Sequence, residues 1–99
     1  MGILLTYDIS SDNKIVKQEL KKKGYKDQFI SDNTVYYLPN KTLWHDKETL
    51  TPKKALKDLH DIIQMQNLTT SPKIEVIRVF AVSFPLSSWA AIQGTQPTL

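Results

Sequence analysis

The sequence contains no cysteine among its 99 residues. This absence excludes a disulfide scaffold, a thiolate metal site, an iron–sulfur cluster and a cysteine nucleophile. Glycine is also scarce, with residues at positions 2, 24 and 94 only. No glycine-rich phosphate loop can therefore form, and the spacings of zinc and EF-hand sites are missing as well. The sequence does not predict a nucleotide- or zinc-dependent enzyme of these motif classes.

Long apolar runs are absent too. Runs such as Ile3–Leu5 and Val79–Val82 are far below the ~20 residues that a membrane-spanning helix needs. No charged segment precedes an apolar stretch in the manner of a secretory signal. We therefore expect no membrane partner and a cytoplasmic location. The composition, 40% hydrophobic and 23% charged residues, is that of a globular domain. We expect one domain over residues 1–92 and a flexible tail over residues 93–99.

Arginine is almost missing from the basic residues. The formal net charge is +3, and of thirteen basic residues twelve are lysines and one is Arg78. Arginine makes bidentate contacts to phosphates and bases, whereas lysine is a point charge on a flexible stem. We therefore expect at most weak, sequence-independent binding to nucleic acid. The candidate contact residues are Lys21, Lys22, Lys23 and Arg78. The three lysines also have a structural interpretation, because cations in the last turn of a helix complement its dipole.

The first half of the chain begins with a strand and a helix. A strand is expected over Gly2–Ile9, where apolar residues on both faces are typical of a central strand. The apolar spacing then predicts a helix over Asn13–Lys23. Gly24 is expected to end this helix with a positive φ.

The middle of the chain predicts a hairpin. The β-rich segment Thr34–Leu38 is followed by the turn dipeptide Pro39–Asn40 and by Lys41–His45 as a returning arm. Aromatic residues in these segments (Tyr36, Tyr37 and Trp44) could stack on nucleic-acid bases or pack within the protein.

The second half predicts one more helix and one more strand. Thr51 is expected to cap a helix whose first residue is Pro52 and whose apolar residues repeat every three to four positions. The last strand is expected over Ile74–Phe84. The order strand, helix, strand, strand, helix, strand indicates an α+β, ferredoxin-like βαββαβ fold, an antiparallel sheet with two helices on one face.

This arrangement leaves the second face of the sheet without a cover from its own helices. The last strand carries apolar residues on that face, among them Val76, Phe80, Val82 and Phe84. Large exposed apolar patches are rare on monomers. We therefore expect a homodimer.

Two segments resemble a known family. Residues 4–9, LLTYDI, end in Tyr-Asp-Ile before a capped helix and are similar to the start of the CRISPR-associated Cas-two family and its stand-alone relatives in phages and bacteria. Residues 79–84, VFAVSF, followed by SWAA at 88–91, resemble the stand-alone branch, where a tryptophan follows the last long strand. The resemblance spans residues 3–92.

The resemblance implies a homodimer of ferredoxin-like protomers. Some members of the family are magnesium-dependent nucleases on RNA or DNA, and others are structural bridges in spacer integration. The aspartate that is the family's proposed metal ligand corresponds to Asp8, which becomes the candidate catalytic residue and Mg²⁺ ligand. The middle strand lacks the family's glutamine–serine–phenylalanine motif. We expect a dimeric structural or nucleic-acid-associated interaction module, with a magnesium-dependent endonuclease as the alternative.

The position of Asp8 alone also allows several roles for its carboxylate. A carboxylate at the end of a central strand can bind magnesium together with water molecules. It can equally accept hydrogen bonds from backbone N–H groups in the following turn, or cap the first helix. The sequence leaves these alternatives open.

Overall fold

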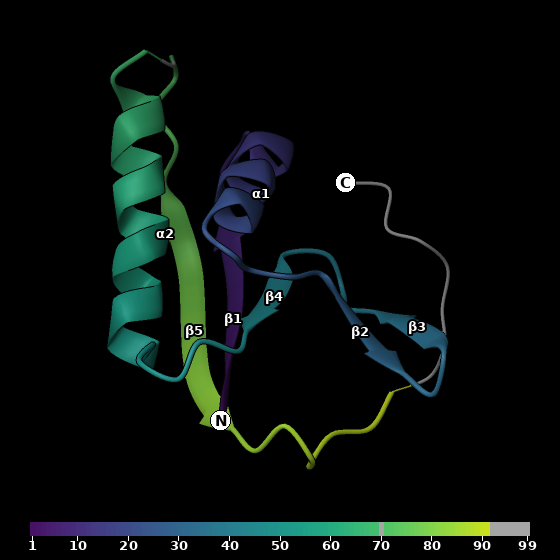
Figure 1. The fold of residues 1–99 in the computed structure, drawn as a ribbon. Coiled ribbons are helices and arrows are strands. Elements are labelled where there is room, and N and C mark those ends of the chain that lie inside the picture. The colour runs from purple at the N-terminus through teal and green to yellow at the C-terminus, as the bar shows by residue number, and fades with distance from the viewer. Residues whose placement is uncertain (70, 92–99) are drawn as a thin grey trace.

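Strand β1 (Gly2–Ile9) is the central strand of a three-stranded antiparallel sheet (Figure 1). Its neighbours are β4 (Thr42–His45) on one side and β5 (Val76–Phe84) on the other. The computed structural model describes residues 1–69 and 71–91, so the predicted tail over residues 93–99 lies outside the described part. The predicted first strand is confirmed, and the last strand begins two residues later than expected.

Both helices begin and end near their predicted residues. Helix α1 spans Asn13–Lys22, and Gly24 follows it with a φ of 100°, a conformation that glycine adopts without steric cost. Helix α2 spans Pro52–Asn67, and the Thr51 side chain accepts a hydrogen bond from the Lys54 backbone N–H at 3.1 Å. Such a cap satisfies one of the free N–H groups in the first turn.

The core lies between the sheet and the two helices. Every second residue of β1 points into it, because successive side chains of a strand point to opposite faces. The buried residues of this core from β1, α1 and α2 are Ile3, Leu5, Tyr7, Ile9, Val16, Leu20, Ala55, Leu59, Ile62 and Ile63. Burial of each large aliphatic side chain stabilises the fold by about 1.5–3 kcal/mol. Both helices therefore cover the same face of the sheet.

The predicted hairpin of Thr34–Leu38 with Lys41–His45 is wrong. Strand β3 (Thr34–Tyr37) pairs with β2 (Gln28–Ser31), and β4 pairs with β1 instead. The cause is the turn at Asp32 and Asn33, whose φ values of 50° and 63° are those of a tight two-residue hairpin loop. Aspartate and asparagine tolerate this left-handed conformation better than most residues.

The fold class is therefore α+β, with a three-stranded antiparallel sheet and two helices. The sheet does not contain the fourth strand that the sequence pattern predicts, because β2 and β3 form a separate two-stranded sheet. Neither α1 nor α2 combines the length and the apolar character that crossing a membrane requires, and this finding concerns the described residues only.

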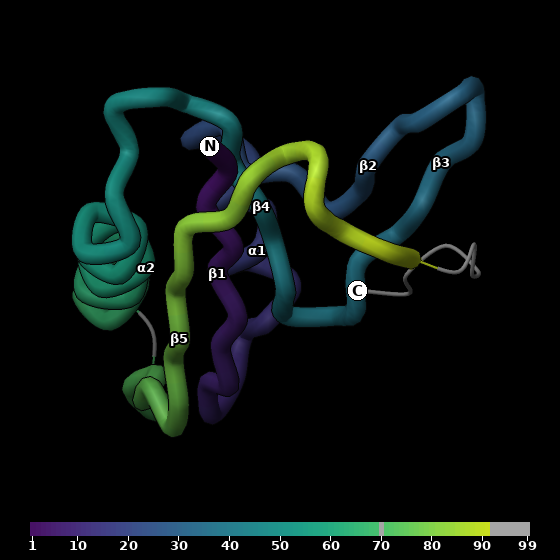
Figure 2. Tube along the Cα trace, turned by 90° about the horizontal axis from the view of Figure 1, so that it is seen from below, coloured from purple at the N-terminus to yellow at the C-terminus, as the bar shows by residue number. Residues whose placement is uncertain are grey.

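The β2–β3 hairpin is held against the sheet by aromatic rings. The Phe29 ring stacks on Trp44 of β4 with the ring centroids 4.2 Å apart, and on Trp89 with the centroids 5.0 Å apart. The Trp44 indole N–H donates a hydrogen bond to the Gln28 carbonyl at 2.8 Å. Figure 2 shows how the segment after β5 crosses over β4 toward the hairpin. Stacked pairs of this kind contribute about 0.5–1.5 kcal/mol beyond the area they bury.

Candidate functional site

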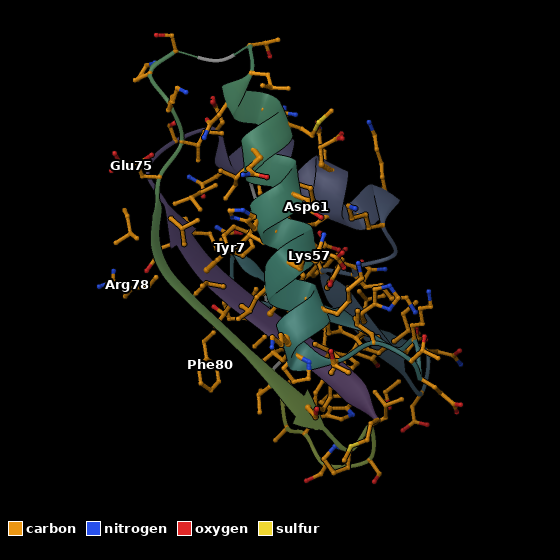
Figure 3. The ribbon with its side chains drawn as sticks, turned by 90° about the vertical axis from the view of Figure 1, so that its left-hand side faces the viewer. Tyr7, Lys57, Asp61, Glu75, Arg78 and Phe80 are labelled. Atoms are coloured by element: carbon orange, nitrogen blue, oxygen red, sulfur yellow. The ribbon has the colours of Figure 1, made fainter. Side chains whose placement is uncertain are left out.

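The face of the sheet away from the helices carries two of the residues that the sequence singled out, Asp8 and Arg78. Asp8 of β1 lies opposite Arg78 of β5, and Thr6 lies opposite Phe80. Figure 3 shows Arg78 and Phe80 projecting from β5 on the side away from α2. We call this surface the open face, defined by Thr6, Asp8, Arg78, Phe80 and Val82.

Asp8 makes two ion pairs on the open face. Arg78 Nε donates a hydrogen bond to Asp8 Oδ2 at 2.9 Å, and Lys41 Nζ lies 3.7 Å from Asp8 Oδ1. The Asp8 side chain is 39% exposed and that of Arg78 is 78% exposed. Water therefore screens the pair, whose contribution to stability is about 0–1 kcal/mol. A divalent cation bound to Asp8 would compete with both basic groups.

Helix α1 does not use Asp8 as its cap. Its N-cap position is Asp12, which has a φ of 57° and makes no side-chain cap hydrogen bond. The end of β1 is instead tied to the start of β5 through Ser10. The Ser10 N–H donates to the Glu75 carbonyl at 2.9 Å, and the Ser10 Oγ accepts from the Glu75 N–H at 2.8 Å. Of the roles open to Asp8 in the sequence, capping α1 is therefore not observed.

A metal site on Asp8 needs oxygen ligands from elsewhere. Residues 1–69 and 71–91 contain no group of three histidine, aspartate or glutamate side chains placed to hold a metal ion. Magnesium is commonly bound by one or two carboxylates, with water or phosphate oxygens completing an octahedron. Asp8 of one chain would supply a single carboxylate, and a second Asp8 would have to come from another copy.

The four candidate nucleic-acid contacts do not lie on one surface. Lys21 pairs with Asp27 at 3.2 Å and Lys22 with Glu19 at 2.7 Å. These residues, and Lys23 after them, belong to the end of α1 in the helix layer, whereas Arg78 lies on the open face. Two of the three lysines are thus neutralised within the protein, and the single arginine is on the opposite side of the sheet.

Among the aromatic residues that could stack on bases, Trp44 is used for packing. It is 8% exposed, and Phe29 covers one side of its ring. The Lys26 ammonium group lies 4.7 Å from the ring centroid of Trp44. Tyr36 contacts Trp89 edge-on, with the ring centroids 5.5 Å apart. These contacts attach the hairpin to the sheet and leave Trp44 unable to receive a base without displacing Phe29 or Lys26.

Two buried tyrosines differ in how their hydroxyl groups are satisfied. The Tyr25 hydroxyl donates a hydrogen bond to Asp58 Oδ2 at 2.9 Å, and burial together with Asp58 raises the pKa of Tyr25. Tyr7 is 3% exposed, and its hydroxyl has no hydrogen-bond partner among the described residues. Burial raises the pKa of Tyr7 to about 12. Both groups belong to the core, and neither reaches the open face.

The sequence predicts the exposure of Phe80 and Val82, but not the position of β5 at an edge of the sheet. Strand β5 is at the border of the sheet and exposes large apolar side chains along its length. Their exposed fractions are Val76 42%, Ile77 59%, Val79 38%, Phe80 62% and Val82 37%. The many apolar residues in 76–82, interrupted only by Arg78, were the signal for this feature, but a buried strand gives a similar pattern.

Comparisons with known proteins give no family for this chain. No protein-family model matches its sequence, and neither the curated proteins nor the solved structures include a significant match. In the part of the chain that the structure describes, the protein has two α+β layers, and the sheet face away from the helices is covered by Phe29 at Trp44 and exposed along β5. Its function is therefore argued from the residues of the open face and of β5.

Proposed function

We propose that the protein is a homodimeric interaction module, similar to stand-alone Cas-two-like proteins, that associates with nucleic acid weakly. The observation that carries this proposal is the row of exposed apolar side chains on β5, in which Phe80 is 62% exposed. Contiguous apolar surface of this kind marks interaction sites on proteins that are otherwise polar outside. A second copy of the chain would cover this surface, and a homodimer is also what the resemblance implies.

The arrangement of the sheet is compatible with a reduced ferredoxin-like fold. The first strand is central, the last strand flanks it on one side, and both helices lie on one face. The hairpin of β2 (Gln28–Ser31) and β3 (Thr34–Tyr37) stands where a second strand of that fold is expected in the sequence. We therefore propose that this hairpin replaces one strand of the main sheet.

The nucleic-acid part of the proposal depends on lysine. The formal net charge of +3 attracts a phosphate backbone without reading its sequence. Since Lys21 and Lys22 already pair with acidic residues, these two candidate contacts attract phosphates less strongly. We expect binding that is weak at ~50 mM salt and about ten-fold or more weaker at ~200 mM salt.

A second candidate function is a magnesium-dependent endonuclease. The observation in its favour is that Asp8 lies on the open face and is 39% exposed. A dimer formed through this face would bring two Asp8 carboxylates toward one seam. Two carboxylates and a Mg²⁺ ion could then activate water and stabilise charge on a phosphodiester.

Two measurements test the proposed function. Light scattering at high micromolar concentration is expected to give twice the mass of one chain, and a monomer there would overturn the proposal. Fluorescence anisotropy with labelled RNA and DNA of several sequences should give weak binding that falls steeply with salt. Tight binding that persists at high salt, or a strict preference for one sequence, would contradict it.

The endonuclease candidate has its own test. RNA and DNA, single- and double-stranded, are incubated with the protein and magnesium or manganese. Cleavage that disappears on chelation and in Asp8→Asn favours the endonuclease. If no substrate is cut with either metal, the endonuclease candidate is wrong and the interaction module is the function that we retain.

A further inference from the structure

Strand β5 exposes apolar side chains on both of its faces. Phe80 and Val82 lie opposite Thr6 and Leu4 on the open face. Val79 lies opposite the buried Tyr7, on the face that the helices cover, and is nevertheless 38% exposed. A partner that packs only against the open face would leave Val79 in water. A partner that adds along the edge of β5 contacts both faces at once.

The two edges of the sheet differ. At β4, the Lys26 N–H donates to the Trp44 carbonyl at 2.8 Å and the Trp44 N–H donates to the Lys26 carbonyl at 2.9 Å. The outer edge of β4 is therefore occupied at Trp44. Within residues 1–69 and 71–91, β5 pairs with β1 alone. Its outer backbone N–H and C=O groups form a template that can pair with another strand.

Strand β5 also lacks the features by which proteins protect an exposed edge. Its nine residues, VIRVFAVSF, include no proline and no lysine, although both are common on free edges. Its one charged residue, Arg78, is paired with Asp8 in its own chain. Two identical β5 edges can therefore approach each other without an uncompensated charge between them.

We infer that the outer edge of β5 pairs antiparallel with β5 of a second copy, joining two three-stranded sheets into one sheet of six strands. This inference rests on the proposed dimer and specifies its interface. A two-fold axis perpendicular to the sheet places one residue of β5 opposite its own copy. Phe80, the middle residue of β5, gives the longest overlap, and Val79 and Ala81 share the next longest. A centre at Arg78 would place like charges directly opposite each other, which is unfavourable.

Cysteine cross-linking tests this geometry directly, because the natural chain has no cysteine. The variants Phe80→Cys, Val79→Cys and Ala81→Cys each introduce a single thiol near the inferred axis. Directly opposite residues of antiparallel strands have Cβ atoms about 4.5–5.5 Å apart, close enough for a disulfide after a small adjustment. We expect one of these variants to form a covalent dimer on mild oxidation. Ile30→Cys, at a 68% exposed position on β2, is the control and should remain uncross-linked.

A charge variant provides the second, independent readout. Ile77 is 59% exposed and Ile30 is 68% exposed, so Ile77→Lys and Ile30→Lys are matched changes at similar exposure. Light scattering should give a monomer for Ile77→Lys and a dimer for Ile30→Lys, with circular dichroism verifying that both variants are folded. If Ile77→Lys does not fold, the cross-linking result decides.

The outcomes separate this inference from the proposed function. A wild-type monomer overturns both the dimer and its interface. A wild-type dimer in which none of Phe80→Cys, Val79→Cys and Ala81→Cys cross-links overturns the edge pairing alone. A folded Ile77→Lys variant that remains dimeric overturns it as well, and then the open face is the seam.

Discussion

Arg78 and Asp8 face each other across the β1–β5 pair, with Arg78 Nε 2.9 Å from Asp8 Oδ2. This contact joins the one arginine of the chain to the one residue that the family resemblance identifies as a metal ligand. Each therefore neutralises the other's charge. A phosphate at Arg78 or a metal ion at Asp8 would compete with this exposed pair, whose contribution is only about 0–1 kcal/mol.

Asp8→Asn should leave the protein folded and dimeric. The ion pairs of Asp8 are exposed, so their removal is expected to change the free energy of unfolding by at most about 1 kcal/mol. Urea denaturation of wild type, Asp8→Asn and Asp61→Asn measures this change. Asp61 is a suitable control because it also makes an exposed ion pair, with Lys57 at 2.7 Å. A loss of several kcal/mol in Asp8→Asn alone would mean that Asp8 has a structural role beyond this pair.

Tyr25→Phe and Tyr7→Phe should have opposite consequences for stability. Tyr25→Phe removes a buried hydrogen bond to Asp58 and is expected to cost about 1–3 kcal/mol, because the carboxylate loses a donor. Tyr7→Phe removes a hydroxyl with no partner among the described residues and should be neutral or stabilising by up to about 1 kcal/mol. Urea denaturation of both variants checks this contrast, and equal destabilisation would contradict it.

Alkaline pH should destabilise the fold through the same tyrosines. Burial raises the pKa of Tyr7 from 10.0 to about 12, so the folded state retains a proton that the unfolded chain loses. The resulting stabilisation is fully present below pH 10 and is lost as the pH rises toward 12. Each such tyrosine adds a slope of up to about 1.4 kcal/mol per pH unit. The free energy of unfolding should fall less steeply between about pH 10 and 12 in Tyr7→Phe than in wild type. Parallel curves would show that Tyr7 ionises normally in the fold.

Phe29→Ala should release the hairpin from the sheet without unfolding the core. Phe29 stacks on both Trp44 and Trp89, whereas the core of β1, α1 and α2 does not include it. Acrylamide should then quench tryptophan fluorescence more strongly, because Trp44 is 8% exposed in the native fold. Far-UV circular dichroism should retain the helical signal. Ile30→Ala, at an exposed position on the same strand, should leave the quenching unchanged.

The sequence predicts β1, α1 and α2 well because their signals are local. Thr51 and Pro52 mark the start of α2, and Gly24 marks the end of α1, and each acts through a backbone conformation that few other residues provide. Strand pairing is different, since it depends on which partner is available in the folded chain. Pro39–Asn40 predicted a hairpin that does not form. The hairpin that does form joins β2 and β3 through the turn at Asp32 and Asn33.

The candidate site could be predicted only in part. Alternation along β1 places Asp8 and Thr6 on the same face, and this follows from the sequence. The partner of Asp8 on β5 does not, because it depends on the register. That register shifts between Asp8 and Ile9, and an irregularity of this kind has no reliable sequence signal. The free edge of β5 could not be predicted from the sequence either, because the composition of β5 is that of a buried strand.

The central position of β1 determines when the sheet can form during folding. Gly2 pairs with Phe84, and Leu4 pairs with residues of both β4 and β5. The pairing of β1 is therefore complete only when β5 is present. Contacts so distant in sequence carry a large loop-closure entropy and slow the search for the native state. While the ribosome is still making residues before Val76, β1 can pair with β4 alone. Completion of the sheet therefore follows the synthesis of β5, and the hairpin of β2 and β3, whose contacts are local, can be in place before it.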